Sequence, residues 1–193
     1  EQMEKLDIVL CVHGESINPD VDVFDREARF IEENFDPMIR RFPNLRVVFE
    51  HISTSDAVNF VNDQNENVVA TVTPQHLAYN RNNLLAGKLR PHKYCAPLLK
   101  KEADRSSLVH AVTADSNEKF FLGTDSAPHL ISEKESSCGC AGCFSAPYAL
   151  AKYAEVFSAE GKLKNLENFT SLNGAKFYGL PVNKDCLLYT SDA

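Results

Sequence analysis

The sequence predicts an α/β protein built on a parallel sheet, and three observations support this class. Apolar runs of strand length recur four times along the 193 residues, at 6–12, 45–49, 67–73 and 119–122. Most of these runs are nearly continuous rather than alternating, which is typical of strands that are buried on both faces. Stretches with helical spacing of apolar residues separate them, and strands that alternate with helices form parallel sheets.

The first half of the chain contains two strand–helix units. The run at 6–12 (LDIVLCV) predicts a strand, and from 24 to 42 the apolar residues recur at intervals of three and four, which predicts a helix. Pro43 ends that helix, and the run at 45–49 (LRVVF) predicts the second strand. Serine and threonine residues then favour the start of a short helix at 53–62.

The second half contains two further units. The run at 67–73 (NVVATVT) predicts the third strand. The long segment 75–99 carries one glycine and two prolines, and we expect it to be mostly loop with one helical turn. The fourth strand, at 119–122, leads into a cysteine-rich loop. The remaining helices are expected at 102–114, 147–157 and 163–172.

Side chains that can bind a metal follow three of the four predicted strands. His13 comes directly after the first strand, His51 closely follows the second, and Asp125 closely follows the fourth. The carboxyl ends of parallel strands meet at one edge of the sheet, where ligands bind in α/β folds. We therefore expect His13, His51 and Asp125 to lie close together.

Two neutral imidazoles and one carboxylate are ligands of a catalytic zinc ion. A zinc ion makes hydroxide available near neutral pH, and a neighbouring carboxylate can move its proton to a leaving group. The alternatives are a buried, hydrogen-bonded core role for each histidine and a helix cap for Asp125. Three ligands on three strands fit either one metal or part of a larger site.

A second group of potential ligands is formed by cysteines. Cys138, Cys140 and Cys143 have C-x-C-x2-C spacing, which supplies three thiols without an evident fourth ligand. This spacing fits either a structural metal or a tight glycine-rich loop whose backbone approaches a ligand. His76, in the long segment after the third strand, is a weaker candidate ligand.

Composition argues against several classes of partner. The chain is 44% hydrophobic and 24% charged, with a net charge of −7 and no run of lysine or arginine, so neither nucleic acid nor membrane partners are expected. No apolar run has the length of a membrane span. Six cysteines without an export signal are typical of reduced thiols, so a cytoplasmic location is expected.

Six segments of the sequence together resemble the dihydroorotase family of the amidohydrolase superfamily, specifically its bacterial-type homodimeric class. They are VHGE at 12–15, FEHIST at 49–54, TPQHLAYNRN at 73–82, RPHKYCAP at 90–97, FLGTDSAPH at 121–129 and KESSCGCAGCFSAP at 134–147. The resemblance extends from about Leu6 to Asn183 and is specific, because the cysteine loop is not general to amidohydrolases.

The resemblance implies a (β/α)8 barrel of the TIM type with two zinc ions at the carboxyl ends of the strands. His13 and His51 match metal ligands on the fifth and sixth strands, and Asp125 matches an eighth-strand ligand that is also the general base. His129 matches a residue that holds the substrate carboxylate. Ala141 matches a backbone contact to substrate, as does Ala96, which replaces the usual leucine and puts the local packing in question.

The chain departs from the family pattern at both ends. The first-strand His-x-His pair and the fourth-strand carboxylated lysine have no counterpart here. The resemblance therefore implies that residues 1–183 are the carboxyl-terminal half of the barrel, strands five to eight plus C-terminal helices. Residues 184–193 leave the pattern, which fits either a foreign tail or a divergent terminus.

The implied activity is the reversible conversion of dihydroorotate and N-carbamoyl-L-aspartate in pyrimidine biosynthesis, by a homodimer when full length. The implied small-molecule chemistry is hydroxide attack on a ring amide, with Asp125 carrying the proton. This half alone is expected to be inactive. Two alternatives are another cyclic-amide hydrolase, of hydantoinase or allantoinase type, and a non-catalytic zinc module built on the cysteine loop.

Overall fold

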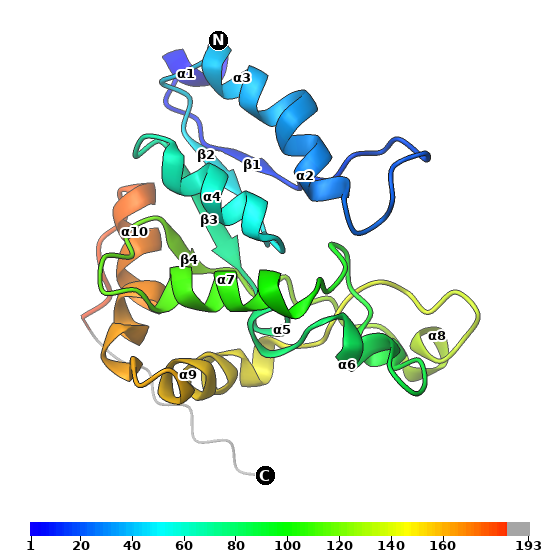
Figure 1. The fold of residues 1–193 in the computed structure, drawn as a ribbon. Coiled ribbons are helices and arrows are strands. Elements are labelled where there is room, and N and C mark those ends of the chain that lie inside the picture. The colour runs from blue at the N-terminus through cyan, green and yellow to red at the C-terminus, as the bar shows by residue number, and fades with distance from the viewer. Residues whose placement is uncertain (185–193) are drawn as a thin grey trace.

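Four parallel strands form a single sheet in the order β1-β2-β3-β4. The computed structural model describes residues 1–184, so all but the first residue of the expected divergent tail lies outside the described residues. Each strand pairs with the next one along the chain, as a barrel requires and as Figure 1 shows. The strands are β1 (Leu10–Val12), β2 (Val47–Phe49), β3 (Val68–Val72) and β4 (Phe120–Leu122).

Helices connect successive strands and cover one side of the sheet, where α3, α4, α7 and α9 follow one another (Figure 1). The α-helices are α1 (Gln2–Lys5), α2 (Arg26–Phe30), α3 (Asp36–Arg41), α4 (Ser55–Asp63), α5 (Pro74–Ala78), α6 (Arg81–Leu85), α7 (Glu102–Thr113), α8 (Ile131–Lys134), α9 (Ala149–Ala159) and α10 (Asn173–Tyr178). Short π-helical turns span Ile31–Phe35 and Asn168–Leu172, and 3-10 turns span Pro91–Lys93, Ala146–Tyr148 and Leu163–Asn165.

The predicted parallel (β/α) order is confirmed, and the differences are local. The first strand is shorter than predicted, since it begins at Leu10 after α1. The predicted helix 24–42 contains a π-helical turn just before Pro37, whose missing N–H cannot continue the regular pattern of bonds. The expectation of one helical turn in 75–99 was too low, because Thr73 and Asn80 each cap a further helix, α5 and α6.

The two faces of the sheet have different partners. Alternate strand residues, including Phe49 and Phe120, join a large buried cluster with helix residues such as Phe35, Val112 and Phe157. The opposite face presents a small cluster of buried strand residues, on which Phe177 of α10 packs: Val48, Val69 and Phe121. The large helix-covered core is thus on one side, as in the wall of a barrel.

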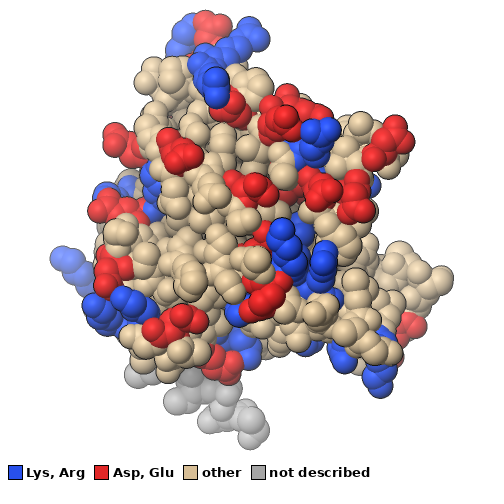
Figure 2. Space-filling view, viewed as in Figure 1, with Lys and Arg blue, Asp and Glu red and all other residues tan. Residues whose placement is uncertain are grey.

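The surface carries charges of both signs. Figure 2 shows acidic and basic side chains interspersed over one face of the molecule. Among residues 1–184, helices are all too short or too polar to cross a membrane.

A buried carboxylate fixes the loop that follows β2. Glu27 of α2 is fully buried and accepts hydrogen bonds from the backbone N–H groups of Ser53 at 2.9 Å and Thr54 at 2.8 Å. Both hydroxyl groups also donate to this carboxylate, at 2.9 Å and 2.5 Å. Burial raises the pKa of Glu27, although these hydrogen bonds oppose the rise. Because Thr54 is the N-cap of α4, Glu27 sets where the chain leaves the sheet after His51.

A buried histidine joins the end of β3 to the loop before α7. His76 accepts a hydrogen bond from the Thr73 hydroxyl at Nδ1, at 2.8 Å, and donates from Nε2 to the Pro97 carbonyl, at 3.0 Å. Burial lowers the pKa of His76 to about 3. His76 is therefore a neutral structural residue, which agrees with the prediction that it is a weaker candidate ligand than His13 and His51.

We expect Glu27→Gln to lower the free energy of unfolding by about 1–3 kcal/mol, because an amide would turn a donor toward groups that are themselves donors. Denaturant titration would measure the change. Glu32→Gln is a matched control, since the Glu32 side chain is 69% exposed and pairs with Arg29 alone among residues 1–184, and such pairs contribute about 0–1 kcal/mol. Equal losses for both variants would contradict the role of Glu27.

We expect His76 to make the protein acid-sensitive. Its folded pKa of about 3 lies below the unfolded value of about 6.5, so the unfolded chain binds the proton more tightly. The stability from the neutral imidazole is complete above about pH 6.5 and is lost as the pH falls toward 3. Unfolding measured from pH 7 to pH 4 should show a smaller pH dependence for His76→Gln, and identical slopes would refute this assignment.

Candidate functional site

The predicted pair of histidines meets at the carboxyl edge of the sheet. Val12 of β1 lies opposite Phe49 of β2 in the parallel register, so the residues that follow each strand are neighbours. His13 Nδ1 lies 3.1 Å from His51 Nε2. Two nitrogen ligands of one tetrahedral zinc, with bonds of about 2.0–2.1 Å, would be separated by about 3.3–3.4 Å. The two imidazoles therefore fit a shared zinc ion.

A close backbone approach holds His13 in place. Gly14 follows it, and a Cβ atom at this position would lie only 2.2 Å from the Phe49 ring. Only glycine fits there without moving the core. The sequence His13-Gly14 is thus required by packing against β2 as well as by the site.

The other nitrogen of His13 has an acidic partner. His13 Nε2 lies 3.4 Å from a carboxylate oxygen of Glu15, and the second oxygen of Glu15 lies 3.8 Å from Lys100 Nζ. Hydrogen bonding to Glu15 raises the pKa of His13. A carboxylate on the far nitrogen of an imidazole fixes the ring orientation and makes the other nitrogen a better metal ligand. Glu15 was not singled out in the sequence, although it stands two residues after a strand-end histidine.

His51 is held mainly through its backbone. Its N–H donates to the Thr71 hydroxyl at 2.7 Å, and that hydroxyl donates to Glu50 at 2.5 Å. Burial lowers the pKa of His51, which favours the neutral imidazole that a metal requires. The Nδ1 atom of His51 is buried without a hydrogen-bond partner among residues 1–184.

Asp125 and His51 share an uncommon backbone conformation. Their φ angles are +42° and +41°, in the left-handed region that non-glycine residues rarely adopt. Such conformations cost about 1–3 kcal/mol each and concentrate at functional sites. Both residues stand just beyond a strand end, where this turn redirects the side chain.

Asp125 lies near the two histidines without closing a three-ligand group. The charge of Asp125 raises the pKa of both His13 and His51, although other effects dominate each shift. Within residues 1–184, these three ligand atoms do not all fall within 4.8 Å of one another. The geometry thus supports a histidine pair for one metal and leaves Asp125 free for a separate position.

Two residues that the resemblance assigns to substrate binding are in contact. His129 Nε2 donates to the Ala141 carbonyl, at 3.1 Å, and both residues are exposed. Ala96 is also exposed, next to the buried Pro97 of a neighbouring loop. His129 thus approaches the cysteine loop at the residue expected to face a substrate.

A buried lysine holds the cysteine loop. Lys134 Nζ donates to the carbonyl oxygens of Tyr94, Cys140 and Gly142, at 3.1, 2.6 and 2.8 Å. The Gly142 N–H in turn donates to the Tyr94 carbonyl at 2.9 Å. These bonds fix the loop carrying Ala141 to the one carrying Ala96, a role that the sequence alone did not reveal.

The three thiols of the cysteine loop do not converge. Cys138 Sγ and Cys140 Sγ are 3.8 Å apart, whereas Cys143 is buried and donates to the His92 carbonyl. The structure brings Cys140 instead within 4.8 Å of ligand atoms of His129 and Glu133. This arrangement favours the glycine-rich loop interpretation over a zinc ion bound by all three cysteines.

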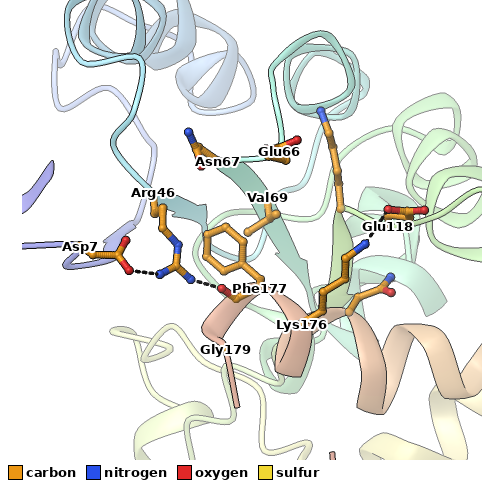
Figure 3. A pocket seen from close by; sticks show the side chains of 11 residues that line it. Asp7, Arg46, Glu66, Asn67, Val69, Glu118, Lys176, Phe177 and Gly179 are labelled. Atoms are coloured by element: carbon orange, nitrogen blue, oxygen red, sulfur yellow. Dashed lines mark hydrogen bonds and ion pairs between the residues drawn. The ribbon is translucent and has the colours of Figure 1, made fainter. Parts of the chain in front are cut away.

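A cavity of about 620 Å³ lies at the opposite end of the sheet from His13, His51 and Asp125. Figure 3 shows Arg46, Asn67 and Val69 on strand starts, facing Phe177 of α10. Most charged side chains that line this cavity are paired. Arg46 donates hydrogen bonds to Asp7 and to the Phe177 carbonyl, and Lys176 donates one to Glu118. Because ligands of parallel α/β folds bind at the carboxyl ends of strands, we assign no active site to this cavity.

Comparison with known proteins identifies relatives over the whole described fold. Dihydroorotase from Neisseria meningitidis is 56% identical over 187 residues, which are 97% of this chain and 54% of that protein. A crystal structure of dihydroorotase from Campylobacter jejuni superposes with a TM-score of 0.83 at 36% identity, covering 95% of this chain and 50% of the other. No protein-family model matches the chain.

A more distant neighbour shares the fold alone. L-Hydantoinase from Arthrobacter aurescens has a TM-score of 0.74 at 17% identity, and the chain covers 45% of it. The chain spans about half the length of the curated relatives that it matches. Sequence identity above 50% over that half, together with the superposition, confirms the predicted resemblance. Over nearly its whole length the chain is thus similar to the carboxyl-terminal half of dihydroorotases.

Proposed function

We propose that this chain supplies half of the active site of a zinc-dependent dihydroorotase. The observation that carries the proposal is the 3.1 Å contact of His13 Nδ1 with His51 Nε2 at the carboxyl edge of the sheet. The names of relatives that are about 56% identical support the choice of dihydroorotate over other cyclic amides. The hydantoinase likeness, at 17% identity, supports the shared fold alone.

His13 and His51 would hold one zinc ion of a two-zinc site, and Asp125 would bind the other. A bound zinc ion would make hydroxide available near neutral pH and polarise the amide carbonyl of the ring. Glu15 would keep the His13 ring in the orientation that points Nδ1 at the metal. The remaining zinc ligands would come from a segment equivalent to the part of the relatives' sequence that this chain does not match.

Asp125 would act as the general base and then as the general acid. Its carboxylate would take the proton of the attacking water and deliver it to the ring nitrogen as the carbon–nitrogen bond breaks, giving N-carbamoyl-L-aspartate. The exposed position of Asp125 beyond β4 leaves its carboxylate accessible for this transfer. The reverse sequence of proton transfers closes the ring.

His129 and the two loop backbones would bind the substrate. The His129 Nε2–H donates to the Ala141 carbonyl, so pairing with the substrate carboxylate would use the Nδ1–H of the doubly protonated imidazolium. Backbone groups of Ala96 and Ala141 would contact the ring, because Lys134 fixes both loops against each other. A backbone contact does not require the leucine that relatives of this class usually have at 96.

The proposal extends to the whole protein. It would be a cytoplasmic homodimer acting on a small molecule, with no nucleic-acid or membrane partner. The non-catalytic zinc module is disfavoured, since Cys143 turns away from the other two thiols.

We expect zinc binding by this chain to depend on the histidine pair. His13→Ala and His51→Ala should each abolish competitive zinc binding measured against a chromophoric chelator. Glu15→Gln should weaken binding by about 10–100-fold, which is the usual effect of removing the partner of a ligating histidine. His110→Ala, at an exposed position of α7, is the control. Zinc content that followed the cysteines instead would contradict the assignment.

We expect dihydroorotate hydrolysis only when both halves are present. The chain would be mixed with a separately produced amino-terminal half of the Neisseria meningitidis relative, with added zinc and bicarbonate, and loss of dihydroorotate followed. Asp125→Asn should lower the rate by about 10²–10⁴-fold, the typical contribution of a general acid–base group. Full turnover by the chain alone, or turnover of hydantoin but not dihydroorotate, would refute the proposal.

A further inference from the structure

Thr71 is a polar residue in an otherwise apolar strand. It stands among three valines and one alanine in β3, and it is only 4% exposed. A buried hydroxyl group in such surroundings is rarely left without hydrogen-bond partners. The partners of this hydroxyl group therefore indicate what Thr71 does.

The Thr71 hydroxyl group is bonded to the turn that follows β2. Its oxygen accepts a hydrogen bond from the backbone N–H of His51 at 2.7 Å, and its proton is donated to Glu50 at 2.5 Å. The backbone carbonyl of Thr71 also accepts from the N–H of Ile52, at 3.0 Å. One residue of β3 thus binds two successive N–H groups of this turn.

The turn needs these bonds because His51 has an unfavourable backbone conformation. Its φ angle is +41°, and a non-glycine residue keeps such a value only where its surroundings impose it. Glu27 binds the chain further on, at the N–H groups of Ser53 and Thr54. Thr71 acts on His51 directly, so the two residues hold different parts of the turn.

Packing against the end of β4 holds the Thr71 side chain in place. A Cβ atom at Gly123, just after β4, would lie 2.7 Å from Thr71 Cβ and 3.0 Å from the hydroxyl oxygen. The threonine side chain therefore occupies the space that a side chain at Gly123 would need. Its branched Cβ also restricts rotation about χ1, which keeps the hydroxyl group directed at the His51 turn.

We propose that Thr71 is a positioning residue, whose hydroxyl group holds the turn so that His51 Nε2 meets His13 Nδ1. The geometry that it maintains is the 3.1 Å contact of the two imidazoles. Thr71 acts through the His51 backbone and touches neither the metal nor the substrate. Because the histidine pair is the zinc site of the proposed function, the effect of Thr71 on zinc binding rests on that function.

The first test measures the zinc affinity of the full chain by competition with a chromophoric chelator. Thr71→Val keeps the branched shape of the side chain and leaves the His51 N–H without its acceptor, so zinc should bind about tenfold more weakly. Thr71→Ser retains the hydroxyl group and should bind zinc within about threefold of the unchanged chain.

Thr113→Val is the matched control for Thr71→Val. Thr113 is also 4% exposed, and its hydroxyl group donates to the Val109 carbonyl within α7. The same substitution thus removes an equally buried hydroxyl group, and zinc affinity should not change. Denaturant unfolding of each variant measures how much the loss of a hydroxyl group alone lowers stability.

The second test needs no zinc. The ring centroids of His13 and His51 are 4.8 Å apart, so NMR cross-relaxation between the two rings should be observed in the metal-free chain. The signal should weaken strongly in Thr71→Val and persist in Thr71→Ser and Thr113→Val. A role in sheet stability alone would lower the stability of Thr71→Val and leave both its ring contact and its zinc affinity unchanged.

Several outcomes would overturn the role of Thr71. One is a ring contact in Thr71→Val equal to that of the unchanged chain, and another is an equal loss in Thr71→Val and Thr113→Val. An unchanged chain that keeps the ring contact and binds no zinc at the histidines would refute the proposed function, and the ring contact would still decide the role of Thr71. If Thr71→Val does not fold, Thr71→Ala compared with Thr71→Ser removes the same hydroxyl group.

Discussion

The parallel register between β1 and β2 is the constraint on which the site depends. Val12 lies opposite Phe49, so His13 emerges beside the chain that follows β2. A shift by one residue would turn the alternate side chains of β1 to the other face of the sheet. The Phe49 ring enforces the register further, because it fills the space that any side chain at Gly14 would need. Burial of one aromatic ring therefore fixes the two imidazoles that meet at 3.1 Å.

The same sheet separates Asp125 from the histidine pair. Neighbouring strands bring His13 and His51 together, whereas Asp125 follows β4, two strands away from β2. Adjacent strands lie about 4.7–4.9 Å apart, so the chain after β4 starts about 10 Å from the chain after β2. The charge of Asp125 acts on the pKa of both histidines. Within residues 1–184, its carboxylate does not join the two imidazole nitrogens in a group whose ligand atoms all lie within 4.8 Å of one another. This separation agrees with the proposed division of His13, His51 and Asp125 between two zinc ions.

Features that depend on local pattern were predictable, and those that depend on distant partners were not. The carboxyl ends of the four strands, and the positions of His13, His51 and Asp125 just beyond three of them, follow from apolar runs and the residues that interrupt them. The π-helical turn before Pro37 was missed, since apolar spacing survives the insertion of one residue into a turn. Glu27 and Lys134 were also missed, because their partners are loop backbone groups that only the folded chain brings within reach. Buried charges of this kind have no periodic signature.

Those buried charges also show how the loops at the carboxyl edge are held without a large apolar core. The cluster beneath them has four buried residues, Leu84, Cys95, Leu99 and Cys143. Glu27 binds backbone N–H groups and Lys134 binds carbonyl groups, so each satisfies several loop donors or acceptors at once with strong, directional bonds. Lys100 differs, since its buried Nζ makes no hydrogen bond within residues 1–184 and lies 3.8 Å from Glu15. Its charge acts on Glu15, and Glu15 lies next to His13 Nε2, so electrostatic contacts orient the His13 ring in addition to the packing of Gly14 against Phe49.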